Sequence, residues 1–175
     1  MAGMGGHPYW YYARYQMDIE TTLETLRQQE FAAGRYNPVL PFINFPIAAD
    51  TPVPGCQHSS IEAAMEAADA DGTRSILDIF QVSAVPYSEA LALATQGGME
   101  LLCTTFPLAT EELMHLFGTT QPTHEQVEAV IISAQQNKAA VEEFWISIDR
   151  GTCRHILLYD GDEPVEVFFV GYSFD

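Results

Sequence analysis

The sequence predicts an α+β fold, a single two-layer domain in which three to five helices pack on a mostly antiparallel sheet of four or five strands. Two apolar runs, residues 155–159 and 165–172, flank an Asp-Gly pair and indicate a C-terminal β-hairpin. Elsewhere, segments with helical spacing of apolar residues alternate with short β-branched or aromatic runs. The length of 175 residues fits one domain, which we expect to span residues 9–175 after a flexible tail, residues 1–8.

The first strand and the first helix have clear local signals. Residues 9–16 read YWYYARYQ, an aromatic run typical of a strand. Because successive side chains of a strand point to opposite faces, one face is expected to hold Tyr9, Tyr11, Ala13 and Tyr15. The other face is expected to hold Trp10, Tyr12 and Arg14. Asp18 is a suitable N-cap and Gly34 a suitable C-terminal stop, so we expect a helix over residues 19–33.

Residues 36–58 hold five of the ten prolines of the chain. Proline is unfavourable in a helix and in a central strand, yet this segment is too apolar for a free linker. We expect an extended, proline-rich arm packed across the domain. Long irregular connections in compact domains are often functional, so the arm is a candidate binding surface.

Two capping-box patterns, starting at Ser59 and Thr123, predict helices over residues 59–68 and 123–150. Within the second helix, residues 144–148 are equally compatible with a strand. The other expected elements are a strand over 75–82, a short helix over 88–93, a strand over 99–108 and a short helix over 110–117. The closing hairpin is expected at the centre of the sheet, because its strands are apolar on both alternating faces.

The charge balance is strongly acidic, with seven Lys and Arg against 24 Asp and Glu and a net charge of −17. No basic stripe is available to contact phosphates, so direct binding of nucleic acid or of an anionic membrane is not expected. The charge has two interpretations. It keeps the surface solvated, or it attracts and selects a basic protein partner.

The cysteines do not indicate a disulfide framework, because their count is three and the chain is neither short nor Cys-dense. The N-terminal residues lack the pattern of a signal peptide, and no apolar stretch reaches the length of a membrane span. We therefore expect a cytoplasmic protein with reduced thiols.

No catalytic or cofactor motif is present, neither G-x-S-x-G, nor H-E-x-x-H, nor a Walker loop, nor a dinucleotide fingerprint. We expect no cofactor and assign no catalytic residue. A Cys-x-His pattern occurs twice, at Cys56 and His58 and at Cys153 and His155, and invites a zinc interpretation. The spacing between the pairs matches no zinc motif, so buried packing is the preferred interpretation of these thiols.

Two functions from different classes fit these observations. The first is an inhibitor- or immunity-like domain that binds a basic protein through the arm and acidic turns, with contacts from Asp50, Asp69, Asp71, Asp160, Asp162 and Glu163. The alternative is an enzyme or small-ligand-binding domain with a site beneath the arm, lined by Arg14, Arg35 and Tyr36. A symmetric homodimer is compatible with the first function.

Overall fold

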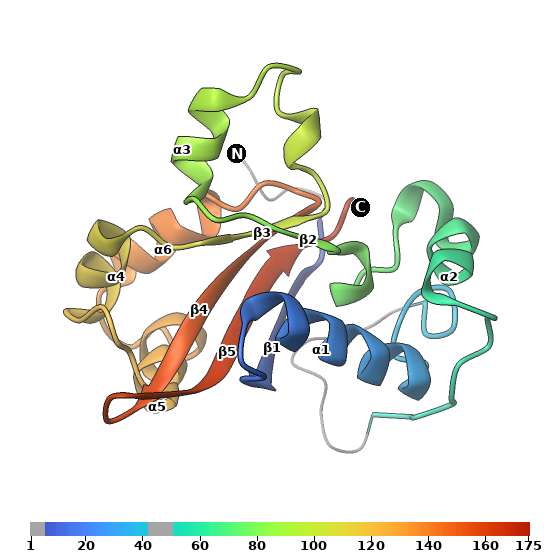
Figure 1. Cartoon of the computed structure of the whole chain (residues 1–175), viewed down its shortest axis with the longest axis horizontal. Coiled ribbons are helices and arrows are strands. Elements are labelled where there is room, and N and C mark those ends of the chain that lie inside the picture. The colour runs from blue at the N-terminus through green and yellow to red at the C-terminus, as the bar shows by residue number, and fades with distance from the viewer. Residues whose placement is uncertain (1–5, 42–50) are drawn as a thin grey trace.

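The computed structural model describes residues 6–41 and 51–175, which contain one sheet of five strands and six α-helices (Figure 1). The strands are β1 (Pro8–Arg14), β2 (Gln81–Val82), β3 (Thr104–Pro107), β4 (Thr152–Asp160) and β5 (Glu163–Tyr172). The α-helices are α1 (Ile19–Ala33), α2 (Ile61–Ala68), α3 (Tyr87–Leu93), α4 (Thr110–Phe117), α5 (His124–Val127) and α6 (Lys138–Ile146). Short turns of other helix types are η1 (Asp69–Asp71), η2 (Ile76–Asp78), η3 (Met99–Leu101) and the π-helical η4 (Glu128–Ile132).

The sheet is mixed, which corrects the prediction of a mostly antiparallel one. The strand order is β1-β5-β4-β3-β2, with β5 antiparallel to both β1 and β4. The pairs β4·β3 and β3·β2 are parallel, because helical crossovers separate these strands along the chain. The hairpin of β4 and β5 lies at the centre, as expected. The predicted strands 75–82 and 99–108 shrink to β2 and β3, since η2 and η3 occupy their first residues.

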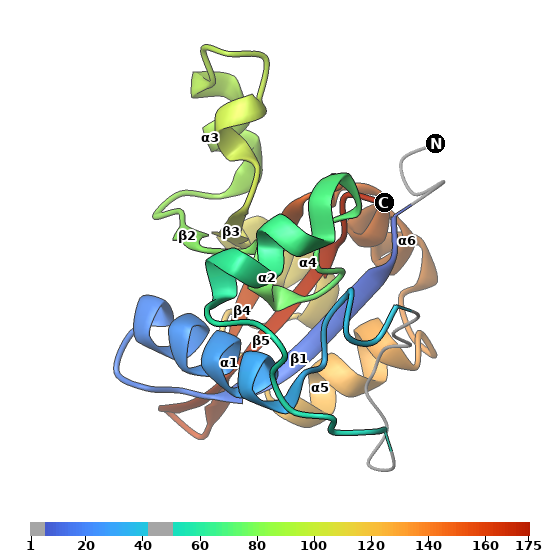
Figure 2. The same cartoon turned by 90° about the vertical axis from the view of Figure 1, so that its right-hand side faces the viewer.

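The helices cover both faces of the sheet, so the fold has three layers and more helices than the sequence indicated (Figures 1 and 2). Helices α1 and α2 pack on one face, in a core that includes Leu23 and Ile61. Helices α4, α5 and α6 pack on the other, in a core that includes Val127 and Phe144. The two-layer prediction is wrong because the apolar alternation of β1, β4 and β5 requires cover on both sides.

The predicted alternation of the first strand is confirmed. Tyr9 and Tyr11 join the core beneath α1 and α2, and Trp10 and Tyr12 pack against the core of the other face. The caps of α1 are also confirmed. The carboxylate of Asp18 accepts a hydrogen bond of 2.6 Å from the backbone of Thr21, and Gly34 takes a left-handed conformation at the end. In α2 the capping residue is Ser60, one position after the predicted one.

The long helix predicted over residues 123–150 is interrupted. Thr123 caps α5 as expected, but the chain then passes through the π-helical η4 and a break before α6 begins. Ala134 and Asn137 have positive φ angles in that break, which ends a right-handed helix. Residues 144–146 continue α6 and form no strand.

The first described residues are attached to the last strand. The backbone N–H of His7 lies 3.0 Å from the carbonyl of Asp175, and Ser173 donates a 3.0 Å backbone bond to the carbonyl of His7. Residues 1–5 of the predicted tail lie outside the described residues. Among residues 6–41 and 51–175, no helix combines the length and apolarity needed to cross a membrane.

Candidate protein-binding surface

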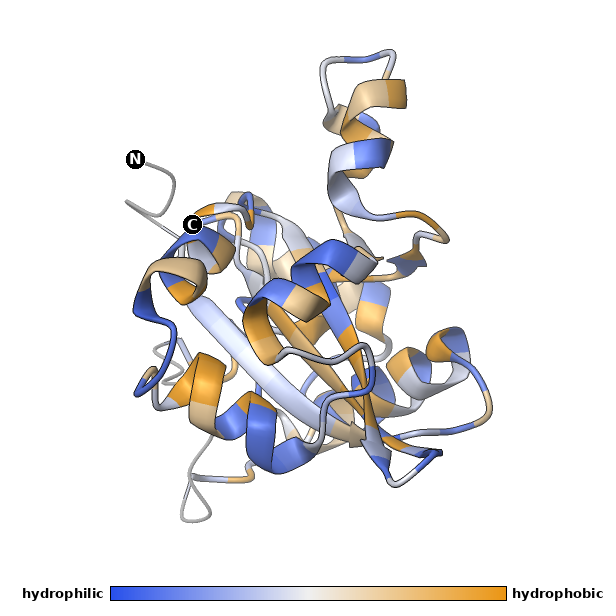
Figure 3. Cartoon of the chain, turned by 90° about the vertical axis from the view of Figure 1, so that its left-hand side faces the viewer, coloured by the Kyte–Doolittle hydropathy of each residue, from blue (hydrophilic) through white to orange (hydrophobic). Residues whose placement is uncertain are grey.

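The connection between β2 and β3 stands away from the rest of the protein (Figures 1, 2 and 3). We call residues 83–103 the protruding segment. A crossover helix between parallel strands normally packs on the sheet, but no residue of α3 is buried. Large apolar side chains are left in solvent, with exposed fractions of 48% at Leu91, 71% at Leu93, 72% at Met99 and 36% at Leu102. Clustered exposed apolar residues of this kind indicate an interaction surface.

The protruding segment has its own internal order. Glu100 accepts backbone hydrogen bonds from Thr95 at 2.6 Å and from Gln96 at 2.9 Å, which closes the turn between α3 and η3. Gly98 has a φ of +87° in that turn, a backbone conformation that residues other than glycine rarely adopt. The apolar residues are therefore presented in a defined arrangement.

A buried arginine fixes the base of the protruding segment. Arg154 on β4 is 4% exposed, and its guanidinium lies 4.1 Å from the ring centre of Tyr87 and 5.5 Å from that of Phe106. It also donates a 2.7 Å hydrogen bond to the carbonyl of Ser147. The hydroxyl of Tyr87 donates to the carboxylate of Asp149. Burial lowers the pKa of Arg154. These contacts attach α3 to the end of α6.

A groove lies between α4 and α6, next to this base. Its cavity measures about 240 Å³, and its lining residues are Glu112, His115, Leu116, Ala140, Glu143, Phe144 and Ser147. The lining combines the exposed carboxylates of Glu112 and Glu143 with apolar side chains, and Glu112 also accepts a 2.7 Å bond from the backbone N–H of Ala109 at the start of α4. A lysine or arginine side chain matches this pattern, because its methylene stem can cover the apolar side chains while its charge meets the carboxylates.

The groove and the base of the protruding segment are connected through shared side-chain contacts. Ser147 lines the groove and binds Arg154, which in turn contacts Tyr87 at the start of α3. Met114 and Ile146 are further exposed apolar residues on the two helices that border the groove. Among residues 83–103 there is no Lys or Arg, so the surface combines apolar side chains with acidic groups.

The three residues predicted to line a pocket do not come together. Arg14 is exposed on the edge strand β1, before the start of α1, whereas Arg35 and Tyr36 follow the end of α1. Fifteen helical residues span about 22 Å, which separates the two groups. Arg35 makes a two-pronged ion pair with Glu30 at 2.9 and 3.0 Å. Tyr36 is fully buried, with its hydroxyl 2.8 Å from Nδ1 of His58.

The acidic residues predicted as partner contacts are exposed but lie at two ends of the molecule. Asp69 and Asp71 follow α2, and the second group, Asp160, Asp162 and Glu163, forms the tip of the β4–β5 hairpin (Figure 1). They do not form one contact surface. Asp50 lies outside the described residues, as does the centre of the proline-rich arm.

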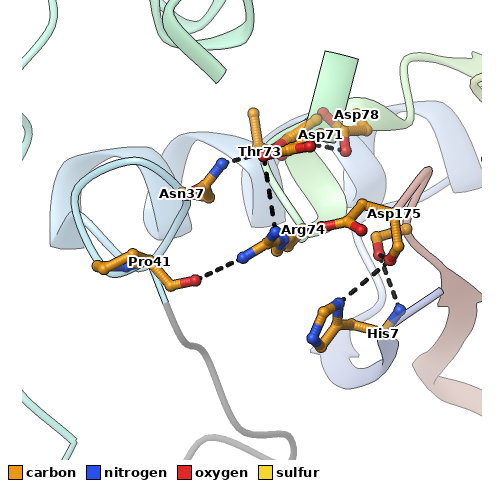
Figure 4. Close-up of polar contacts among 10 residues, drawn as sticks. His7, Asn37, Pro41, Asp71, Thr73, Arg74, Asp78 and Asp175 are labelled. Carbon is orange, nitrogen blue, oxygen red and sulfur yellow. Dashed lines mark hydrogen bonds and ion pairs between the residues drawn. The ribbon is translucent and has the colours of Figure 1, made fainter. Parts of the chain in front are cut away.

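Arg74 joins several of these segments (Figure 4). Its guanidinium donates to the carbonyl of Pro41 at 2.6 Å and pairs with Asp175, and Asp71 lies 3.7 Å away. The neighbouring Asp78 is buried, which raises its pKa, and accepts bonds from the backbone and hydroxyl of Thr73. Each of these side chains has at least one partner within the fold, so the cluster ties the segments together.

A polar cluster near the hairpin involves the π-helical turn. The hydroxyl of Tyr12 donates a 2.6 Å bond to Glu128 in η4, and the ring of His124 stacks on Tyr12 at 4.0 Å. Nδ1 of His124 lies 2.8 Å from the carboxylate of Glu166. Burial is the main cause that raises the pKa of Tyr12, and the hydrogen bond to Glu128 raises it further. This cluster binds α5 and η4 to the sheet.

The two Cys-x-His pairs make separate contacts. His58 bonds to Tyr36, whereas His155 bonds to Thr105, and Cys56 is exposed while Cys153 is buried. In the part of the chain that the structure describes, no group of three or more His, Cys, Asp or Glu side chains is arranged to hold a metal ion.

Sequence reasoning missed the exposed apolar surface of the protruding segment. It predicted a short helix over 88–93 but gave no weight to the sequence Ala90-Leu91-Ala92-Leu93-Ala94, whose consecutive apolar residues cannot all face one side of a helix. Such a run normally indicates a buried helix, so the exposure of α3 could not be predicted from it.

Comparisons of the chain with protein-family models, with curated proteins and with solved structures returned no significant match.

Proposed function

We propose that this protein binds a basic protein partner through the protruding segment and the α4/α6 groove. The observation that carries the proposal is an ordered apolar projection, free of basic residues, that adjoins a groove with two carboxylates. The partner segment would place apolar side chains against Leu93 and Met99 and a lysine or arginine into the groove.

Charge complementarity favours a basic partner over a second copy of this chain. With a net charge of −17, two copies repel each other, and their grooves present the same sign of charge. A basic partner gains from both the long-range field and the two groove carboxylates. Apolar contact would supply the remaining affinity, as in helix-in-groove recognition.

The proposal can be tested with a defined probe, a fluorescent amphipathic helical peptide of leucine, lysine and arginine. A peptide of the same length with glutamate in place of the basic residues serves as the comparison. We expect binding of the basic peptide only, measured by fluorescence anisotropy, and weaker binding at high salt because screening shortens the reach of the charges.

Two double variants locate the contact. Leu93→Ser with Met99→Ser removes the apolar tip, and Glu112→Gln with Glu143→Gln removes the groove charges. Each is expected to weaken peptide binding about tenfold or more, the effect of losing about 1.4 kcal/mol of contact energy.

The matched control is Asp162→Asn with Glu163→Gln, which removes two exposed charges from the tip of the β4–β5 hairpin, away from the groove. It should leave the affinity nearly unchanged. Equal weakening by this control would show non-specific attraction to the net charge and would overturn the proposed surface. A concentration-dependent dimer that the Leu93 and Met99 double variant abolishes would instead assign the surface to self-association.

A further inference from the structure

A second cavity lies where β4 extends beyond its parallel neighbour. β3 pairs with β4 only as far as His155, whereas β4 continues to Asp160. Pro107 ends β3, and the chain turns away into α4. The gap leaves a cavity of about 270 Å³, lined by Ile19, Pro107, Leu108, Leu113, Thr120, His155, Ile156, Leu157 and Tyr159.

The walls of this cavity come from both faces of the sheet. Ile19 and Leu157 pack with the core beneath α1 and α2, whereas Leu108, Leu113 and Ile156 pack with the core of the opposite face. The cavity therefore lies in the layer of the sheet itself, between two packed cores that hold its shape. No charged side chain is among its lining residues.

His155 supplies the polar feature of the cavity. It is 6% exposed, and its Nδ1 lies 3.0 Å from the hydroxyl of Thr105, which is fully buried. Burial, followed by the charge of Arg154, lowers the pKa of His155 to about 3, so the imidazole is neutral at physiological pH.

The second ring nitrogen of His155, Nε2, has no hydrogen-bond partner among residues 6–41 and 51–175. Nε2 is not among the fully enclosed side-chain atoms that lack a partner, so it is open to the cavity, where water or a ligand can satisfy it. Because His155 lines the cavity, Nε2 is the atom available to a molecule inside it.

We propose that this cavity binds a small uncharged molecule with an apolar body and one hydroxyl group. The hydroxyl would bond to Nε2 of His155, and because it can both donate and accept, it satisfies either tautomer of the imidazole. The apolar body would contact the leucine and isoleucine walls. An engineered cavity of about 150 Å³ binds benzene, so this larger space fits a ligand of about ten non-hydrogen atoms.

The surroundings select against charged ligands. A carboxylate would be buried beside a neutral imidazole without a cation to pair with, which is costly. The strong negative charge of the protein also repels anions from its surface. The site is thus distinct from the proposed protein-binding groove, whose recognition depends on charge.

Three probes of similar shape test the site: naphthol, methylnaphthalene and naphthoate. Two-dimensional NMR of the whole chain should show naphthol shifting the signals of His155 and of the wall residues Leu108, Leu113 and Leu157. Naphthol is expected to bind about fivefold more tightly than methylnaphthalene, which lacks the hydrogen bond, and naphthoate is expected not to bind.

Two variants on α4 separate the cavity from the surface around it. Leu113→Phe should fill the cavity and reduce naphthol binding at least tenfold. Met114→Phe adds the same ring at an exposed neighbouring position and should leave binding unchanged. His155→Phe should reduce naphthol binding to the level of methylnaphthalene.

Binding of naphthol by the Leu113→Phe variant with wild-type affinity would overturn the proposal. So would shifts outside the cavity walls, or no binding of any probe up to its solubility. None of these outcomes depends on peptide binding at the α4/α6 groove, which is tested by separate variants.

Discussion

Acid is expected to destabilise the fold through His155, because its buried imidazole must gain a charge. A histidine in the unfolded chain ionises near pH 6.5, whereas burial lowers the pKa of His155 in the fold to about 3. The folded pKa is the lower of the two, so the unfolded chain takes up the proton first. The stability contributed by the neutral ring is complete above pH 6.5 and is lost as the pH falls toward 3.

The size of this effect follows from the shift in pKa. Each pH unit between the two pKa values costs about 1.4 kcal/mol, which gives about 3 kcal/mol near pH 4.5. Protonation of the carboxylates acts in the opposite direction, because it relieves the repulsion of a net charge of −17. Burial also raises the pKa of Asp78, so Asp78 favours the fold as the pH falls. A comparison with a variant is therefore needed.

The assay is urea denaturation of the wild type and of His155→Gln at several pH values from neutral to about 4.5. The difference in unfolding free energy between the two should shrink by about 1.4 kcal/mol per pH unit below 6.5. NMR of the wild-type imidazole gives the same answer without a variant. A constant difference, or an imidazole that titrates near 6.5, would refute the reasoning.

Three further predictions concern other positions. Gly151→Ala should destabilise the fold by about 2 kcal/mol more than Gly161→Ala, as measured by thermal unfolding. The new Cβ at position 151 would lie 2.5 Å from the ring of Phe174, whereas at position 161 it would lie in open space. Arg154→Met should speed amide hydrogen exchange in α3 and η3 about thirtyfold, because about 2 kcal/mol of contact with the two aromatic rings and the Ser147 carbonyl is lost. Exchange rates in α3 and η3 that equal those of the wild type would contradict the role of Arg154 at the base of the protruding segment. Alkylation should label exposed Cys56 faster than buried Cys153 by a factor on the order of a thousand, because burial raises the pKa of Cys153 to about 12. The labelling rates are compared by mass spectrometry, and equal rates would count against the burial of Cys153.

Local signals in the sequence were sufficient to predict the elements whose structure depends on local contacts. The cap at Asp18, the stop at Gly34 and the alternation of β1 all involve neighbours within a few residues. The C-terminal hairpin was equally accessible, because its turn joins consecutive strands.

The parallel half of the sheet could not be predicted in this way. β2 has only two residues, and its pairing with β3 depends on a crossover whose helix contributes no buried side chain. The break between α5 and α6 likewise depends on the left-handed conformations of Ala134 and Asn137, which the helical spacing of apolar residues conceals.

The candidate sites depend on contacts between distant residues. The α4/α6 groove is lined by Glu112 and Glu143, which are far apart in the sequence. The cavity at β4 exists because Pro107 ends β3 while β4 continues. Sequence reasoning noted His155 only as part of a Cys-x-His pair, for which it preferred buried packing over zinc binding. It could not foresee that Thr105 would occupy one ring nitrogen.

The position of β5 determines when the fold can form during synthesis. β5 is the latest strand along the chain, yet it separates β1 from β4 and joins partners as distant as Tyr9 and Gly171. Until β5 has emerged from the ribosome, β1 and α1 have no sheet to complete, and their aromatic residues remain exposed. The order of the strands along the chain thus makes the pairing of β1 with the sheet dependent on the hairpin.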